Sequence, residues 1–392
     1  MKRFGLILLL LAVTVPVWSA VNKKVTVAQL KELLVSLQTD KKSDVAVAAE
    51  LKQLELTEEL TTSTMLTLAP MVNGPLSTEQ IYVLEARSST LPPPPADLPA
   101  DAAPDAAAQQ ALLKKAQEYV SKTHTKLPHL TANKMIARFQ DGVEAVHTFS
   151  GMNQGMSQDT DPLWTTSSLD VRLINTRTLP VETENGVEKA PAAKDTTRWG
   201  QNNMVASIGT PLSLSQVMQE ASANGGLTWL RWEMVNGKQT AVFSFSVDKK
   251  KTKFVVNYCC FPDTDTSGML GSGITMSQGG ANGGTGNLQT TSEWKPFKAS
   301  TGYHGELFID PVLGVVVRTV TEADFKPADF VHREAIRTDF APMSIGGKVL
   351  VVPVRSFTIS EVVPNGDSFA AKYAVRHSFV TQDYKDYQLA VK

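Results

Sequence analysis

Apolar residues recur at helical spacing through the first part of the chain. Four of them share one stripe of the segment VTVAQLKELLVSLQTD, namely Val27, Leu30, Leu34 and Leu37. Such a stripe is typical of an amphipathic helix. A second helix is predicted over residues 44–55, and Thr57 is expected to cap a third run that ends near Pro70. Ser77 and Gln80 fit a capping box that opens a fourth helix. These short helices are expected to form a small bundle, or to dock their stripes on a later domain.

Prolines then interrupt the helical pattern. Five of them fall between Pro92 and Pro99. Because such a segment favours extended polyproline conformations, residues 88–108 are expected to form a semi-rigid linker after a helical region at 20–87. The alanine-rich segment that follows predicts a helix over about 105–122.

From Ala132 onward apolar and polar residues alternate, as in strands with one buried face. Asp141-Gly142 and Asn236-Gly237 are predicted hairpin turns. Further strands are expected in KFVVNYCCF, YHGELFID, VVVRTVTEAD, GGKVLVVPVRSFTIS and SFAAKYAVRHSFV. A single helix is predicted near 213–222. The expected fold is therefore α+β: an N-terminal short-helix region, then a helix and a large curved antiparallel sheet in residues 109–392, with one covering helix.

The first residues indicate where the chain works. Lys2 and Arg3 precede the apolar run Phe4–Val15, so residues 1–19 are interpreted as a secretory signal peptide that is cut after Ser19. The mature protein is expected to be extracytoplasmic, either periplasmic or secreted, and to lack a transmembrane segment. The formal net charge is only -1, with both signs interspersed, which gives no reason to expect a nucleic-acid partner.

Sequence motifs for catalysis or cofactor binding are absent. The glycine-rich segment 263–300 has no phosphate-binding spacing and is expected to be a flexible loop. The six histidines form no close pair of metal ligands, and no serine-nucleophile motif occurs. We therefore predict no catalytic residue, no cofactor and no metal. His304 and Glu306, which point the same way from one strand, form an acid/base or metal alternative, and His377 is expected to be a hydrogen-bonded core imidazole.

Cys259 and Cys260 are the only cysteines, and they are adjacent. Neighbouring side chains of a strand point to opposite faces, and consecutive α-carbons lie closer than an ordinary disulfide prefers. Two buried free thiols are therefore one interpretation. A vicinal disulfide in a strained turn at the strand end is another, since the compartment is oxidising. A metal or redox role is the third.

Several segments resemble a family of exported bacterial proteins without an assigned function. They are AVFSFSVDKKKTKFVVNYCCF, YHGELFIDPVLGVVVRTVTEADFKP and MSIGGKVLVVPVRSFTIS. The strand pair around IDPVLGVVV is also similar to outer-membrane lipoprotein-sorting proteins of the LolA type. That resemblance implies a half-barrel sheet closed by a helix, whose inner face holds acyl chains or packs on another envelope protein. Four aromatic side chains are candidates to line that face: Trp232, Phe243, Phe245 and Tyr258.

The expected function is that of an exported, non-enzymatic envelope protein that binds or carries a lipid or another hydrophobic ligand. The alternative is a protein-interaction or scaffold module of the cell envelope with no small-molecule ligand. A hydrolase that uses His304 and Glu306 is a third hypothesis.

Overall fold

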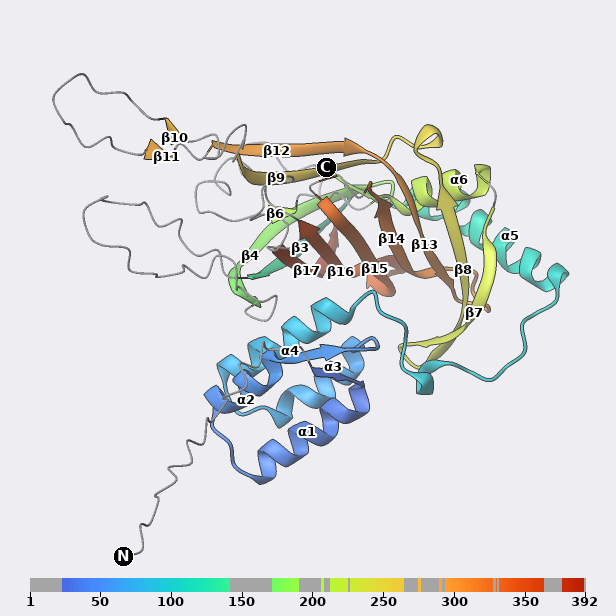
Figure 1. Ribbon diagram of the computed structural model, residues 1–392. Helices are drawn as coiled ribbons and strands as arrows, with labels where there is room; N and C mark the ends of the chain where they lie inside the picture. Colours follow the sequence, from blue (N-terminus) through green and yellow to red (C-terminus); the bar gives the residue numbers. More distant parts are fainter. Residues whose placement is uncertain are drawn as a thin grey trace, which may run out of the picture.

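The computed structural model describes most of the chain, and it shows an α+β protein with helices first and a large antiparallel sheet after them (Figure 1). The described residues are 23–141, 171–189, 206–207, 212–224, 226–263, 274–275, 289–290, 293–326, 329, 331–362 and 376–390. The predicted signal peptide 1–19 lies outside them.

The N-terminal bundle, residues 23–91, has its own apolar core. Its elements are β1 (Lys23–Val25), α1 (Val27–Thr39), α2 (Asp44–Lys52), β2 (Leu54–Leu56), α3 (Thr62–Leu68), a 3-10 turn (Ala69–Met71) and α4 (Pro75–Ser88). The predicted stripe of α1 is buried, and it packs with Leu51, Met65 and Leu84 from the other helices. Strand β1 pairs in parallel with β2. The helical periodicity of this region is thus explained by burial inside the bundle.

Two predicted helix starts are wrong, and tertiary contacts give the reason. Helix α3 is capped by Thr61, whose hydroxyl accepts from the Thr64 N–H, rather than by Thr57. Helix α4 begins at Pro75, and Ser77 lies inside it. The Asp44 carboxylate accepts hydrogen bonds from the Ser77 N–H at 2.8 Å and the Ser77 hydroxyl at 2.6 Å. A carboxylate from another helix therefore replaces the local capping box.

Ten strands form one open sheet in the order β5-β4-β3-β17-β16-β15-β14-β13-β8-β7, and all neighbours are antiparallel. Their bounds are β3 Leu130–Asp141, β4 Val171–Glu184, β5 Val187–Glu188, β7 Thr228–Val235, β8 Lys238–Val247, β13 Gly302–Ile309, β14 Val316–Asp324, β15 Val331–Ile345, β16 Lys348–Val362 and β17 Arg376–Leu389. The predicted Asn236-Gly237 hairpin joins β7 to β8, with φ angles of 51° and 75°. Strand β3 runs unbroken to Asp141, whereas Gly142 lies outside the described residues.

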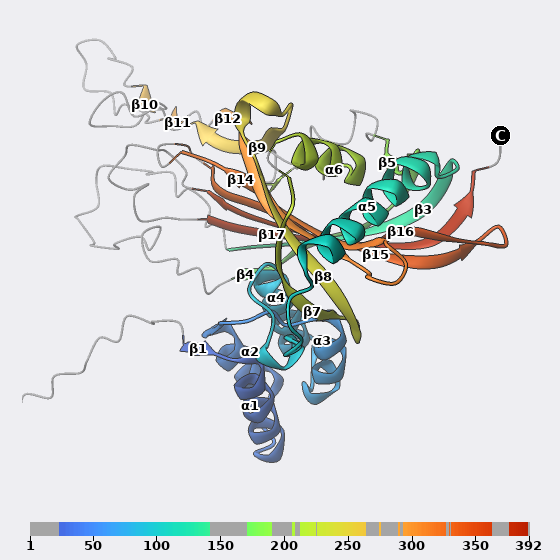
Figure 2. The ribbon, with the colours of Figure 1, turned by 90° about the vertical axis from the view of Figure 1, so that its right-hand side faces the viewer.

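The two faces of this sheet have different partners (Figure 2). Helices α5 (Ala106–Lys122) and α6 (Leu214–Ala223) pack on one face, here called the core face. Its buried side chains include Phe243, Tyr303 and Leu307. Two helices thus cover this face, where the sequence predicted one. The N-terminal bundle packs on the opposite face, here called the bundle face, through α4, whose Val83 and Ala86 contact strand residues.

The proline-rich linker lies against the sheet and contains a short 3-10 turn, Pro95–Asp97. The Trp232 indole N–H donates to the Ala102 carbonyl at 3.0 Å. The Gln239 amide donates to the Asp101 carboxylate at 3.1 Å. The linker is therefore fastened to β7 and β8 by side-chain hydrogen bonds.

Smaller sheets complete the described part of the chain. Strands β6 (Ala206–Ser207), β9 (Val255–Asp263) and β12 (Glu293–Ser300) form one of them, and β10 (Ile274–Thr275) pairs with β11 (Gln289–Thr290). Strand β12 corrects the end of the predicted loop 263–300, because its backbone pairs with β9. The rest of that segment, apart from the short β10 and β11, lies outside the described residues. Cys259 and Cys260 lie in β9, but their side chains are not among those described, so the disulfide stays a prediction.

Candidate functional site

Strand register places charged side chains in rows across the bundle face. One row crosses β13 to β17 and consists of Phe308, Arg318, Asp339, Arg355 and Asp383. A second row consists of Arg333, Glu361 and His377. Residues directly opposite each other in an antiparallel sheet share a face, so these charges point together at the N-terminal bundle.

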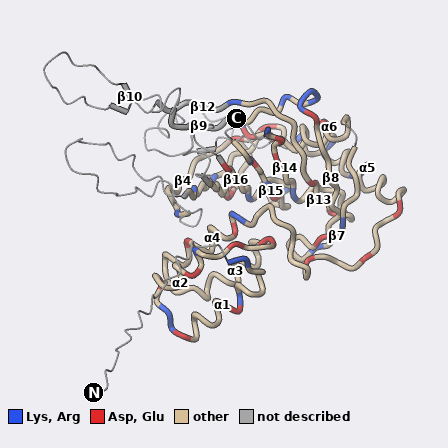
Figure 3. Tube along the Cα trace, in the orientation of Figure 1, with Lys and Arg blue, Asp and Glu red and all other residues tan. Residues whose placement is uncertain are grey.

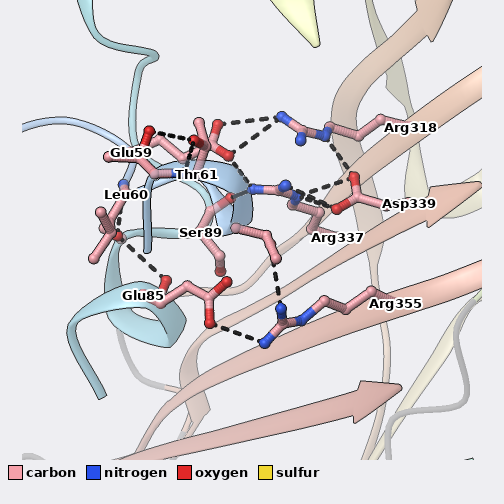
Figure 4. A network of polar contacts seen from close by, with 12 residues as sticks. Glu59, Leu60, Thr61, Glu85, Ser89, Arg318, Arg337, Asp339 and Arg355 are labelled. Carbon is pink, nitrogen blue, oxygen red and sulfur yellow. Dashed lines mark hydrogen bonds and ion pairs between the residues drawn. The ribbon is translucent and has the colours of Figure 1, made fainter. Parts of the chain in front are cut away.

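Arg337 is the centre of a buried network between bundle and sheet (Figure 4). Its side chain is 2% exposed, although it carries a full charge. The guanidinium donates to Glu59 of the bundle, to the Ser89 carbonyl at 3.1 Å and to Asp339 at 2.8 Å. Each of the three guanidinium nitrogens thus donates to at least one acceptor, which offsets the cost of burying the charge.

Arg318 closes the network from the neighbouring strand. It donates to Asp339 at 2.6 Å and to Glu59 at 3.2 Å. Burial alone would raise the pKa of Asp339, but Arg318 and Arg337 outweigh it and lower that pKa to about 2. Two arginines therefore share Glu59 and Asp339, and a third buried carboxylate, Glu233, lies 3.8 Å from Arg318.

A second bridge joins α4 to the sheet. Arg355 donates to Glu85 at 2.9 Å and lies 3.3 Å from the Asp383 carboxylate. Burial raises the pKa of Glu85, and the charge of Arg355 opposes that shift only in part. Charged residues occur over the whole described chain (Figure 3), but Glu59, Glu85 and Arg337 are buried between the N-terminal bundle and the sheet. Buried ion pairs between two elements can specify how those elements dock.

A cavity of about 210 Å³ opens beside this network. It lies between β2 and α4 on one side and β15, β16 and β17 on the other, and we call it the junction pocket. Its lining residues are Glu55, Leu56, Leu84, Arg87, Ser88, Leu91, Arg333, Ile359, Glu361, His377 and Phe379. Apolar and charged side chains therefore meet in one small space, as in many ligand sites at domain junctions.

The two arginines of the junction pocket differ in their bonding. Arg333 donates to Glu322 at 3.2 Å and to Thr90 at 3.0 Å, and it lies 3.5 Å from Glu361. Arg87 forms no hydrogen bond or ion pair with any described residue. Burial lowers the pKa of Arg87, while the charges of Glu55 and Glu361 oppose that shift. Glu55 likewise has no direct partner in the described chain, so an arginine and a glutamate attract each other without touching.

The structure does not bring the four predicted aromatic side chains to this pocket. Phe243 and Phe245 are 0% and 5% exposed and belong to the core under α5 and α6. Trp232 packs at the edge of that core, where its ring contacts Trp229. The side chain of Tyr258 lies outside the described residues. A hydrophobic ligand at these positions stays a prediction.

His304 and Glu306 have separate partners. The His304 imidazole lies 2.7 Å from the Asp324 carboxylate, and Glu306 accepts from Arg231 at 2.8 Å. His377 lies in the junction pocket, and its ring stacks on Phe379 with a centroid distance of 6.4 Å. Among the described residues, no group of three or more metal-ligating side chains comes together. None of the described helices is long and apolar enough to span a membrane.

Comparisons with known protein families, curated proteins and solved structures give no match for this chain. The LolA-type resemblance therefore remains an expectation, and the argument for function depends on the geometry alone.

Sequence reasoning missed the network and the pocket. The available signal was the presence of arginines inside segments that alternate like strands: Arg318, Arg333, Arg337 and Arg355. Charged residues are rarely buried without partners. Four arginines in buried strands therefore indicate that carboxylates from elsewhere cover the same face.

Proposed function

We propose that this chain is an exported, non-enzymatic binding protein that holds a small charged ligand in the junction pocket. The observation that carries the proposal is the pair Arg87 and Glu55, which line a cavity and make no direct contact with a described partner. Unpaired charges inside a partly apolar pocket are costly without a ligand and favourable with one.

The core face offers less support for a ligand. Its apolar side chains are in contact with α5 and α6, whose Val120, Val217 and Met218 are buried there. A lipid on this face would have to displace at least one helix, and it would expose the apolar surface that the helix covers. The proposal therefore differs from the hydrophobic-ligand expectation in both the ligand class and the place.

Protein interaction is a second candidate function, supported by a different observation. The turn between β13 and β14 exposes two adjacent apolar residues, Val312 at 80% and Leu313 at 63%. The hairpin tip between β15 and β16 exposes Val349 at 72%. Exposed apolar side chains on sheet turns are typical of contact surfaces when they adjoin.

The proposed function is tested on full-length protein purified from its own cells, by native and then denaturing mass spectrometry. Three forms are compared: wild type, Arg87→Gln, and Lys122→Gln as a control on the exposed side of α5. We expect a small molecule on wild type and on the control, and its loss from Arg87→Gln. A lipid that Arg87→Gln retains would refute the junction pocket as the binding site.

A further inference from the structure

We infer that the junction pocket is shaped for a small zwitterion with an apolar side chain, that is, a free apolar α-amino acid. The inference rests on the proposed function, because it names the ligand class of the same pocket. It follows from three features of the lining: the two unpaired charged side chains, the equal number of arginines and glutamates, and the apolar residues among them.

The unpaired charges of Arg87 and Glu55 indicate which charged groups the ligand carries. Arg87 can bind a carboxylate through two parallel N–H donors, a geometry that guanidinium groups favour. Glu55 can accept hydrogen bonds from an ammonium group. The charge of Glu55 is the first of the favourable charges that act on Arg87, yet the two side chains form no ion pair. Because both side chains line the same pocket, a ligand that carries both charges can pair with each of them.

The charge balance excludes ligands with one charge. The pocket lining carries two arginines, Arg87 and Arg333, and two glutamates, Glu55 and Glu361. Arg333 already donates to Glu322 and Thr90, and it also lies 3.5 Å from Glu361. A simple carboxylate would pair with Arg87 but leave Glu55 alone, whereas a simple amine would do the reverse. Only a zwitterion leaves neither charge unpaired.

The apolar residues among the lining and the volume of the pocket bear on the side chain and the size of the ligand. Five of its lining residues are apolar: Leu56, Leu84, Leu91, Ile359 and Phe379. Its volume of about 210 Å³ equals that of about seven water molecules in the liquid. This space suits a branched or linear aliphatic side chain beside the two charged groups, and it is small for an ordinary drug-sized ligand.

The inference is tested by isothermal titration calorimetry of the full chain with three probes of one shape. L-leucine carries both charges, 4-methylpentanoate lacks the ammonium group, and 3-methylbutylamine lacks the carboxylate. We expect leucine to bind, and each single-charge probe to bind at least about tenfold more weakly, because a half-buried charge, that of Glu55 or of Arg87, then stays unpaired.

Matched variants test which side chain of the pocket binds the carboxylate and which binds the ammonium group of the ligand. Arg87→Gln should weaken leucine at least about tenfold and remove its advantage over 3-methylbutylamine. Glu55→Gln should remove the advantage over 4-methylpentanoate, and Lys122→Gln should change nothing. Arg87→Lys keeps the charge but loses the planar pair of donors, so an intermediate loss is expected. Unchanged circular dichroism and melting temperature exclude misfolding as the cause.

The outcomes separate this inference from the proposed function. If 4-methylpentanoate binds as tightly as leucine and only Arg87→Gln weakens both, the zwitterion is refuted but the charged pocket stands. If no probe binds while mass spectrometry finds another molecule that depends on Arg87, the inference fails and the proposed function survives. If no probe binds and no co-purified molecule depends on Arg87, both fail.

Discussion

Helices pack on both faces of the ten-stranded sheet, with apolar contacts on the core face and a mixture of apolar contacts and buried ion pairs on the bundle face. On the core face, α5 and α6 cover aromatic and aliphatic side chains such as Phe243 and Leu307. On the bundle face, the N-terminal helices cover arginines and carboxylates, including Arg337 and Glu59. Apolar burial stabilises almost any close packing, whereas a buried ion pair stabilises only one arrangement of its partners. We therefore expect the buried ion pairs of the bundle face to determine how the bundle sits on the sheet.

The same contrast bears on the junction pocket, which lies on the bundle face. Apolar side chains of different shape interdigitate and leave little space. Charged groups keep fixed geometries with their partners, so Arg333 is held by Glu322 and Thr90 while Arg87 faces a gap. The junction pocket is thus a consequence of covering a sheet with charges.

Removal of one buried charge should produce the largest effect. Glu59→Gln removes the carboxylate that Arg318 and Arg337 share, and leaves them with Asp339 and, 3.8 Å from Arg318, with Glu233 in a desolvated site. We expect a loss of about 3 to 5 kcal/mol in the free energy of unfolding. Urea unfolding followed by circular dichroism measures it.

A charge-balanced double variant provides the control for Glu59→Gln. Glu59→Met combined with Arg337→Met removes one charge of each sign and leaves Arg318 paired with Asp339. Its loss should be clearly smaller than that of Glu59→Gln, because buried pairs can be exchanged for apolar residues at little cost. An equal or larger loss would mean that shape, not charge, decides the docking.

A cavity on the core face should have a somewhat smaller effect. Leu307 is fully buried under the helices, so Leu307→Ala should cost about 2 to 4 kcal/mol through lost transfer energy and a residual void. Unlike Glu59→Gln, this variant should respond to added salt as the wild type does. A strong salt dependence in Leu307→Ala would contradict the division between the two faces.

Acid should weaken the bundle face selectively. The pKa of Asp339 is lowered from its usual 3.8 to about 2, so its stabilising effect is complete above about pH 4 and is lost as the pH falls through about 2. The shift corresponds to about 2 kcal/mol. Unfolding free energies at pH 4 and pH 2 should differ by about that much more in wild type than in Asp339→Asn. Equal differences would contradict the assigned pKa.

An exposed ion pair should show almost no effect. Lys122 and Glu118 lie 3.5 Å apart on the open side of α5. Replacing either with alanine should change the free energy of unfolding by less than about 0.5 kcal/mol. Thermal melting would detect a larger change, which would show that solvent-exposed charges matter as much as the buried ones.

Local sequence patterns predicted the helices and turns better than they predicted the contacts between those elements. The helices α1, α5 and α6 and the Asn236-Gly237 hairpin follow from periodicity and turn chemistry. The start of α4 does not, because its cap comes from Asp44 of another helix. Alternation likewise tells which strand residues share a face, but not what covers that face.

The candidate site depends on contacts across most of the chain. Glu59 and Arg337 are 278 positions apart, and no local rule relates them. The aromatic residues attracted attention because aromatic side chains often line ligand sites, yet Phe243 and Phe245 are in the core. The LolA-like half-barrel remains a proposal: the large antiparallel sheet is present, but it is not closed into a barrel.

The proline-rich linker lies near β7, an edge strand at which two copies of this chain could pair. In the described sheet β7 has a single neighbour, β8, so its outer side is a template on which a foreign strand could assemble. The segment fastened there through Trp232 and Ala102 is rich in proline. Proline has no N–H to offer, so a segment of this composition can lie near β7 without prolonging the sheet. We expect a tether of this kind to hinder the pairing of β7 with a strand of a second copy.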